Sequence, residues 1–283
     1  MHTFLHHSMA GLCGVVGANH SVDEIAVDLE WTGEESTTTF SDERVTIIGS
    51  FTEEWEGNQP VSIGDDIYLW LWGSIFSIKG NNGYIPRKPK NETAAEACID
   101  LYEQYGLDFV SRLNGDFVGV IYDQPEQTLS IFTDRLCLRD IYYTKPNCET
   151  LVFSTAIQSL SRHPDVTPAF NLEFITEYFT CDFRTFGLKT PLQDTYLFPP
   201  GTISSIDTKT AQKESHAYWQ PRYQPLDRPF SYFLDEFTSR FKKAVWERMR
   251  PCREYGLLLS GGADSRLVLA AMDQAARENV TAY

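Results

Sequence analysis

Residues 260–265, "SGGADS", combine hydroxyls, glycines and a carboxylate at a spacing that suits an anion. They follow the apolar run Leu257–Leu259 and precede a segment with helical character from about residue 264. Glycines let the backbone approach an anion closely, and the unpaired N–H groups of a helix start point at it. The hydroxyls of Ser260 and Ser265 can also donate to phosphate oxygens. The pattern therefore predicts a phosphate-binding strand, loop and helix.

The carboxylate of Asp264 cannot bind phosphate directly. Two roles remain for it, which are capping the helix and holding Mg²⁺. The string lacks Gly-Lys-Ser/Thr, so it is not a Walker A loop. The simpler alternative is an ordinary strand-to-helix turn with glycines and an aspartate cap.

The elements around this loop change character at a proline-rich stretch. Residues 221–229 contain three prolines and predict a linker. Downstream, apolar residues recur on one face of a helix over 230–249. A strand at 255–259, a helix at 264–278 and a strand at "VTAY" follow. This order predicts the beginning of an α/β unit with parallel strands.

Upstream of the linker the chain is rich in short strands separated by turn signals. Strand-like runs fall at 11–18, 44–52, 67–78, 117–122, 128–133, 141–144 and 151–155, with a further pair around "TISSID" and "HAYW". One helix is well marked, because Thr93 and Glu96 fit a capping box and Gly106 follows as a stop. Helices are also predicted near 155–162 and 171–180. Asn114 and Asp116 read as turn residues, and Asp134 and Arg135 as structural.

Composition excludes several classes of partner. The 283 residues carry a net charge of −15, which argues against binding nucleic acid or an anionic membrane. The longest apolar run, "IYLWLWGSIFSI", is about half of a membrane span. The 6 cysteines are scattered without zinc spacing, which indicates a reduced, cytoplasmic protein. An acidic chain with more Arg than Lys suits either a halophile or an ordinary acidic protein.

Two family resemblances connect these parts. "LLLSGGADS" resembles the pyrophosphate loop of the ATP pyrophosphatase family, and "GLCGVVG" resembles the start of class II glutamine amidotransferases. Four further strings resemble asparagine synthetase in the same order; they are "LNGDFVGVIYD", "TDRLCLRDIYY", "FSTAIQSL" and "LFPPGTISSID". The chain is thus similar to a glutamine-hydrolysing asparagine synthetase that ends just after its ATP loop. It would be truncated, or one piece of a split protein.

The resemblance implies an α+β fold in two parts. The first is a four-layer αββα sandwich of the N-terminal nucleophile hydrolase type, and the second is the beginning of an α/β parallel-sheet nucleotide-binding domain. The implied divisions are a leader or propeptide at 1–12, an amidotransferase type 2-like domain at 13–220, the linker at 221–229 and a synthetase fragment at 230–283. The resemblance also implies that the loop binds ATP and Mg²⁺. The implied ATP-binding residues are Leu259, Ser260, Gly261, Gly262, Asp264 and Ser265, and the implied Mg²⁺ ligand is Asp264.

In the first domain the resemblance assigns the nucleophile to Cys13. That role requires removal of residues 1–12, since the α-amine of the cysteine must act as base; otherwise Cys13 is a small buried residue. The oxyanion segment corresponds to "WGSIFS", so Trp72 stands where an Asn amide is expected, and Gly73 retains its N–H. The acid that holds the amine of glutamine corresponds to Ala94, and the Arg-Gly-Pro-Asp string is missing. These changes describe a degraded glutaminase site.

Three hypotheses follow. The first is an ATP-dependent ligase that adenylates a carboxylate, that of aspartate by resemblance, before ammonia from glutamine or another amine attacks. The second is a non-catalytic amidotransferase-like module, or a gene fragment, that docks on a separately made synthetase half. The third is a related ligase that forms a different amide.

Overall fold

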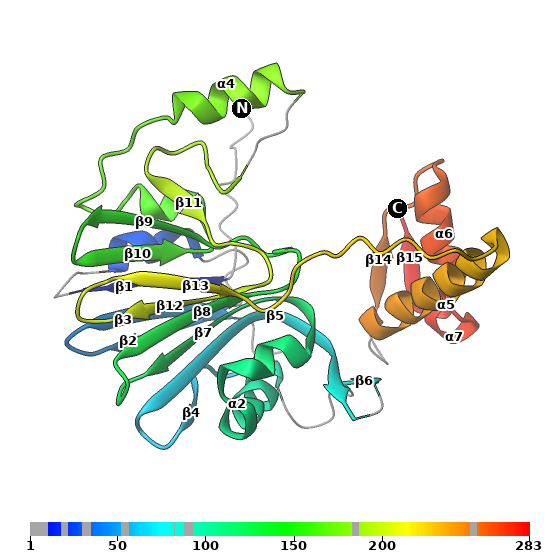
Figure 1. Cartoon of the computed structure of the whole chain (residues 1–283), viewed down its shortest axis with the longest axis horizontal. Helices are drawn as coiled ribbons and strands as arrows, with labels where there is room; N and C mark the ends of the chain where they lie inside the picture. Colours follow the sequence, from blue (N-terminus) through cyan, green and yellow to red (C-terminus); the bar gives the residue numbers. More distant parts are fainter. Residues whose placement is uncertain are drawn as a thin grey trace.

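The computed structural model describes residues 11–17, 22–29, 35–51, 57–81, 83–87, 93–182, 187–249 and 254–283. They form a large sandwich and a small C-terminal unit, joined by a stretch at 220–229 that has no helix or strand (Figure 1). The two units touch where Asn114 Nδ2 donates to Glu247 Oε2 at 3.3 Å. Nearby, the guanidinium of Arg248 lies 4.3 Å from the centre of the Phe76 ring.

The first sheet of the sandwich has six strands in the order β11-β9-β10-β1-β3-β2, with antiparallel pairing throughout. Its strands are β1 (Gly11–Val16), β2 (Ser36–Ser41), β3 (Val45–Phe51), β9 (Tyr142–Asn147), β10 (Thr150–Ser154) and β11 (Thr195–Leu197). Successive side chains of a strand face opposite sides of the sheet. In β1, Leu12 and Val16 therefore join the core between the sheets, whereas Cys13 and Val15 face the other way.

The second sheet has seven strands in the order β13-β12-β8-β7-β5-β4, and β6 also pairs with β5. Its strands are β4 (Val61–Ile63), β5 (Ile67–Gly80), β6 (Gly83–Pro86), β7 (Leu113–Asp123), β8 (Thr128–Thr133), β12 (Thr202–Asp207) and β13 (Lys213–Ala217). Asn114 and Asp116 lie within β7, so the prediction of a turn there was wrong. Both residues pair with β5 in the ladder, opposite Ser77 and Ser74.

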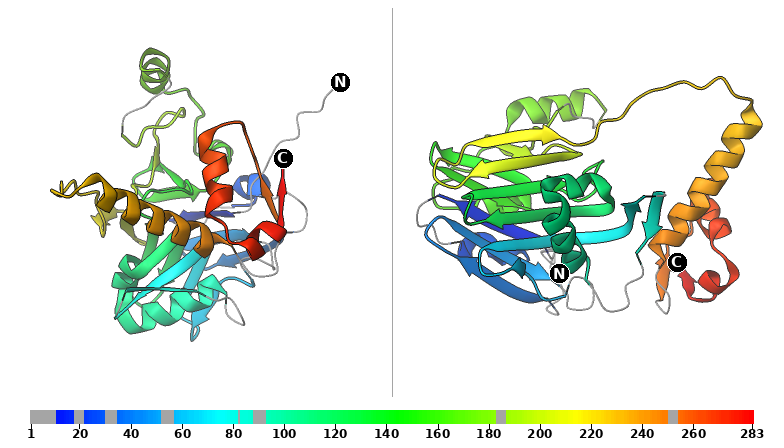
Figure 2. Two further views of the ribbon diagram at one scale, coloured as in Figure 1. Left: turned by 90° about the vertical axis from the view of Figure 1, so that its right-hand side faces the viewer. Right: turned by 60° about the horizontal axis from the view of Figure 1, so that its bottom comes forward.

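Three apolar clusters define the layers. Trp70, Phe153 and their neighbours fill the space between the sheets. The helix α2 (Ala94–Tyr105) and the 3₁₀ turn η2 (Gly106–Arg112) pack on the outer face of the second sheet. On the outer face of the first sheet lie α1 (Asp23–Ala26), η1 (Val27–Leu29) and α3 (Ile157–Leu160). The predicted αββα order is confirmed (Figures 1 and 2).

Two helices of the sandwich begin at side-chain caps. In α2, Thr93 accepts the Glu96 N–H at 3.2 Å, while the Glu96 carboxylate accepts the Thr93 N–H at 2.5 Å. The predicted capping box is thus confirmed, and Gly106 ends the helix. The helix α4 (Leu172–Thr180) begins at Asn171 and has no buried residue; it lies at one side of the sandwich, away from the sheets (Figure 1).

The small unit contains α5 (Phe230–Arg248), β14 (Tyr255–Leu257), α6 (Ala263–Ala271), α7 (Gln274–Glu278) and β15 (Val280–Ala282). The strands β14 and β15 pair in parallel, as predicted. A single helix over 264–278 was predicted, and this was wrong. The helix breaks after Ala271 because Asp273 starts a new one, accepting the Ala276 N–H at 2.8 Å.

Candidate functional sites

The glycine loop lies at a β-to-α corner, as the sequence predicts. Residues 258–262 connect β14 to α6, and Ser260, Gly261, Gly262 and Asp264 are all exposed. The N-cap of α6 is Gly262, in an extended conformation and without a side-chain cap. The start of α6 therefore keeps N–H groups available to an anion from solvent.

Two serines shape this loop. Ser260 Oγ and Ser265 Oγ are 3.1 Å apart, and the Gly262 N–H donates to Ser260 Oγ at 3.2 Å. The hydroxyl of Ser265 also lies 3.2 Å from the Ser260 carbonyl, to which it can donate. These bonds span the loop from its first to its last residue. Leu259 holds its strand side, with its N–H donating to the Tyr283 carbonyl at 2.8 Å.

Asp264 lies in the first turn of α6, and it is not the helix cap. Of its two predicted roles, capping is therefore wrong. Mg²⁺ is commonly held by one or two carboxylates together with substrate phosphates. Asp264 is a single exposed carboxylate beside the glycine loop, which is the kind of side chain that such a site uses. Over the described ranges, no group of three His, Cys, Asp or Glu side chains could hold a metal alone.

A second site is a pocket of about 450 Å³ in the sandwich. It is built from β5 and β7 on one side, and from segments 138–142 and 155–158 on the other. Its lining consists of Trp72, Asp116, Leu138, Arg139, Asp140, Tyr142, Thr155, Ala156, Ile157 and Gln158. Trp72, which the sequence analysis places in the oxyanion segment, thus lines the pocket. The pocket also contains the charged residues Asp116, Arg139 and Asp140, which the sequence analysis did not assign to a site.

Arg139 covers the segment at Trp72 and Gly73. Its guanidinium lies 4.6 Å from the centre of the Trp72 ring, and its Nη2 lies 3.9 Å from Asp116 Oδ2. Gly73 has a φ of +121°, and a Cβ there would lie 2.8 Å from Arg139 Nε. The Ser74 N–H donates to Asp116 Oδ1 at 3.2 Å. Arg139 and Asp116 therefore occupy the surroundings where oxyanion donors were expected.

The acids of the pocket have different surroundings. Burial raises the pKa of Asp116, although Arg139 and the Ser74 N–H oppose that shift. Asp140 is exposed and accepts a hydrogen bond from the Tyr142 hydroxyl at 2.9 Å. The pKa of Tyr142 is raised by burial and by the Asp140 charge. The phenol is therefore a hydrogen-bond donor at neutral pH and not a base.

Cys13 does not reach this pocket. Its side chain is 0% exposed and belongs to the cluster beneath α1 and α3, with Ala156 and Tyr142 in the same cluster. Those two residues also line the pocket, whereas Cys13 is not among the residues that line it. Burial raises the pKa of the Cys13 thiol well above its usual range. In this arrangement Cys13 has the environment of a structural residue.

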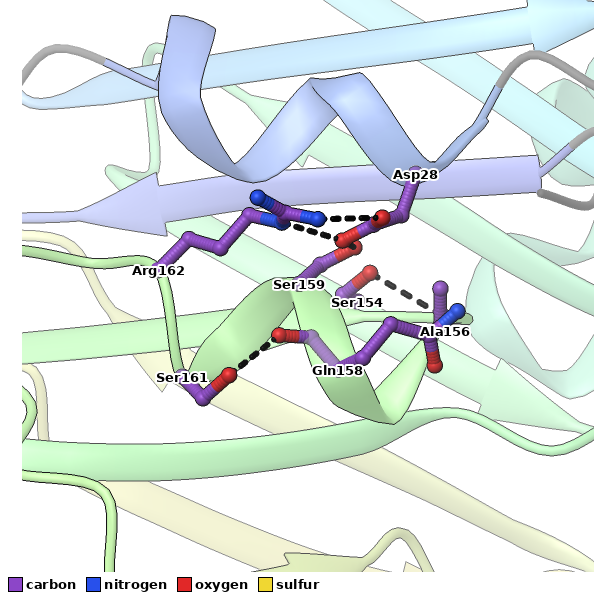
Figure 3. A network of polar contacts seen from close by, with 7 residues as sticks. All are labelled: Asp28, Ser154, Ala156, Gln158, Ser159, Ser161 and Arg162. Atoms are coloured by element: carbon purple, nitrogen blue, oxygen red, sulfur yellow. Dashed lines mark hydrogen bonds and ion pairs between the residues drawn. The ribbon is translucent and has the colours of Figure 1, made fainter. Parts of the chain in front are cut away.

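One wall of the pocket depends on an ion pair. Segment 155–158 runs into α3, which is too short to be stable alone. Figure 3 shows Arg162, just after α3, donating two bonds to Asp28 of η1, at 2.7 and 2.9 Å. Ser159 Oγ lies 3.5 Å from the same carboxylate, and Ser154 Oγ accepts the Ala156 N–H at 3.0 Å. These bonds fix α3 and hence the wall.

Comparison with known families places both units. Residues 12–219 match the family "Glutamine amidotransferase domain", which is most of the chain. This chain belongs to the glutamine amidotransferase domain family. Residues 236–283 of this amidotransferase-family chain match "Asparagine synthase".

Asp134 has the structural role predicted for it, since its buried carboxylate accepts hydrogen bonds from the backbone N–H groups of Phe117, Leu136 and Leu138.

Several known proteins are similar to this chain in sequence. A probable asparagine synthetase [glutamine-hydrolyzing] of Schizosaccharomyces pombe is 24% identical over 295 residues, covering 94% of this chain and 45% of that protein. Amidase chry2 of Gibberella zeae is 30% identical over 184 residues, covering 61% of this chain and 25% of that protein. The chain thus spans less than half the length of these relatives. Among solved structures, B. subtilis glutamine phosphoribosylpyrophosphate amidotransferase with ADP and GMP aligns over 96% of this chain and 65% of its own, at TM-score 0.46 and 11% identity.

Proposed function

We propose that this chain is part of an ATP-dependent amide-forming ligase of the asparagine synthetase type. A carboxylate, that of aspartate, would be activated as an acyl-adenylate, and ammonia from glutamine or another amine would displace AMP. The observation that carries this proposal is the exposed loop 260–265 between β14 and α6. Its helix-start N–H groups and two hydroxyls suit a pyrophosphoryl group, and no lysine is present in the loop to clamp a transferable γ-phosphate.

In this proposal the loop residues bind and orient the nucleotide. Gly261 and Gly262 let the backbone approach the phosphates, and Ser260 and Ser265 exchange their mutual contact for bonds to phosphate oxygens. Mg²⁺, held between Asp264 and the phosphates, would supply charge neutralisation for the departing pyrophosphate. Leu259, just before the loop, matches a family position near the nucleotide and would lie close to it.

Calorimetric titration of the full chain with Mg-ATP and with Mg-pyrophosphate tests this proposal. Both should bind, and Ser265→Ala should weaken binding about tenfold or more, since a hydrogen bond to a charged group is worth about 1.5–3 kcal/mol. Ser239→Ala is the matched control, because Ser239 is an exposed serine on α5. Absence of binding, or equal effects of the two substitutions, would refute the proposal.

A docking role is the second candidate function. It is supported by the buried Cys13 and by large apolar side chains exposed on α5, namely Phe230, Phe233, Leu234, Phe237 and Trp246. A separately made synthetase chain would be the partner, and the protein would act in the cytoplasm. Among the described residues no helix is both long and apolar enough to cross a membrane.

Mass spectrometry of the N-terminus separates the two candidate functions. A mature chain that begins at Cys13 favours glutaminase chemistry, and one that retains "HTFLHHS" favours docking.

A further inference from the structure

The glycine loop offers hydroxyls and backbone N–H groups to a ligand, but its one charged side chain is the anion Asp264. A diphosphate group carries several negative charges, so a cation beside the loop would strengthen its binding. Hydrogen bonds between ionised partners are about twice as strong as those between neutral ones. Between residues 254 and 276 the sequence contains a single lysine or arginine, which is Arg266, directly after the loop.

Arg266 lies near the start of α6, and its side chain is bonded to the residue that caps that helix. Its Nε donates to the Gly262 carbonyl at 3.1 Å. The side chains of a helix are tilted toward the helix N-terminus, so a residue at this position can reach back to the cap. The hydrogen bond therefore holds the guanidinium beside the start of α6, where N–H groups are available to an anion.

The fold gains little from this hydrogen bond. The carbonyl of an N-cap residue already accepts the first backbone hydrogen bond of its helix, so the bond from Nε is an additional one. Arg266 is exposed, and within the described part of the chain the Gly262 carbonyl is its one hydrogen-bond partner. The N–H groups of Nη1 and Nη2 are thus free to bind a ligand.

The electrostatics of the helix also favour an anion next to Arg266. The start of a helix carries a partial positive charge, so a cation placed there is unfavourable until an anion binds. An arginine presents its N–H groups in a planar fork that matches two oxygens of a phosphate. Arg266 therefore has the position, the charge and the free donors that a phosphate group requires.

We propose that Arg266 is a further phosphate-binding residue, and that it lets the glycine loop hold a diphosphate group without Mg²⁺. The Nη groups donate to phosphate oxygens, while Nε keeps its bond to Gly262. The N–H groups at the start of α6 and the hydroxyl of Ser265 bind the same ligand, as in the proposed function, on which this inference rests. Mg²⁺ at Asp264 strengthens this binding but is not required for it.

Isothermal titration of the full chain with sodium pyrophosphate, once with excess EDTA and once with excess MgCl₂, tests this inference. Wild type should bind in both conditions. Arg266→Gln should weaken metal-free binding tenfold or more, and binding with Mg²⁺ by a smaller factor, because the metal neutralises part of the ligand charge. Arg266→Lys should restore part of the metal-free binding, since it keeps the charge without the fork.

Asp264→Asn should act in the opposite direction in EDTA. It removes a negative charge beside the ligand, so metal-free pyrophosphate should bind more tightly than to wild type. With Mg²⁺ present the same substitution should weaken binding, because a carboxylate that holds the metal is lost. A role of Arg266 and Asp264 in the fold alone would not produce these opposite signs.

Arg240→Gln is the matched control, since Arg240 is an exposed arginine of α5 that is paired with Glu236. Urea unfolding without ligand should show the same midpoint for Arg266→Gln and wild type. The inference is wrong, while the proposed function stands, if pyrophosphate binds with Mg²⁺ but not in EDTA. The same holds if Arg266→Gln weakens binding no more than Arg240→Gln does. If pyrophosphate binds in neither condition, the proposed function fails and this inference fails with it.

Discussion

Substitution of Asp28 by Asn should destabilise the sandwich through the pair that anchors α3. The Asp28 side chain is 9% exposed, and it accepts two bonds from Arg162 at 2.7 and 2.9 Å. An Asn keeps at most one good acceptor and loses the charge. Each charge-assisted bond is worth about 1.5–3 kcal/mol. The Arg162 side chain is 45% exposed and can be solvated after the change, so the total loss is reduced to about 2–3 kcal/mol.

Urea unfolding followed by near-ultraviolet circular dichroism measures this loss, and a double-mutant cycle with Arg162→Gln isolates the pair. The coupling energy between the two substitutions should be about 1–2 kcal/mol. The control is Glu236→Gln, which removes an exposed i,i+4 pair with Arg240 and should change stability by less than about 0.5 kcal/mol. A coupling energy near zero would refute the anchoring role of the pair, and so would an Asp28→Asn loss no larger than that of the control.

Three further predictions concern other elements. Gly73→Ala should cost about 3 kcal/mol or more in urea unfolding, since its Cβ would lie 2.1 Å from the Asp116 carbonyl oxygen and φ is +121°; a loss below 1 kcal/mol would contradict this close packing. Thr93→Ala should cost about 1 kcal/mol by removing the cap of α2, and Thr93→Ser should restore most of it. Burial of Asp42 raises its pKa, but hydrogen bonds from Tyr122, Gln124 and two backbone N–H groups outweigh burial and leave that pKa below 3.8. The ionised Asp42 therefore stabilises the fold above pH 3.8, and this contribution is lost as pH falls through the depressed value. The stability difference between wild type and Asp42→Asn should shrink between pH 7 and pH 3, and an unchanged difference would contradict the assignment.

Much of the fold follows from local patterns in the sequence. The capping box at Thr93, the stop at Gly106 and the amphipathic pattern of α5 each depend on neighbouring residues, so they are readable without tertiary contacts. The same holds for the strand, glycine loop and helix around 255–271. Short edge strands such as β4 were missed because a strand of three residues carries too little alternation to be recognised.

The pocket could not be predicted in the same way, because its residues come from four separate segments. Asp116 was interpreted as part of a turn, and Arg139 and Asp140 lie in a string that resembles asparagine synthetase but that assigned neither of them to a site. The sequence also does not predict which side of the sheet Cys13 faces. Alternation along β1 places Leu12 and Cys13 on opposite faces of the sheet, but it does not tell which of these faces packs against the other sheet. These features depend on long-range strand pairing, such as that of β1 with β10.

Hydrogen exchange of the full chain, measured by mass spectrometry with and without Mg-pyrophosphate, tests the central claim most directly. If backbone N–H groups of the glycine loop hold the phosphates, the peptide that covers residues 257–268 should gain protection, while peptides from β7 and β8 should not change. The same peptide of Ser265→Ala should gain less at equal ligand concentration. No protection of 257–268 at saturating Mg-pyrophosphate, or protection confined to the sandwich, would contradict the account.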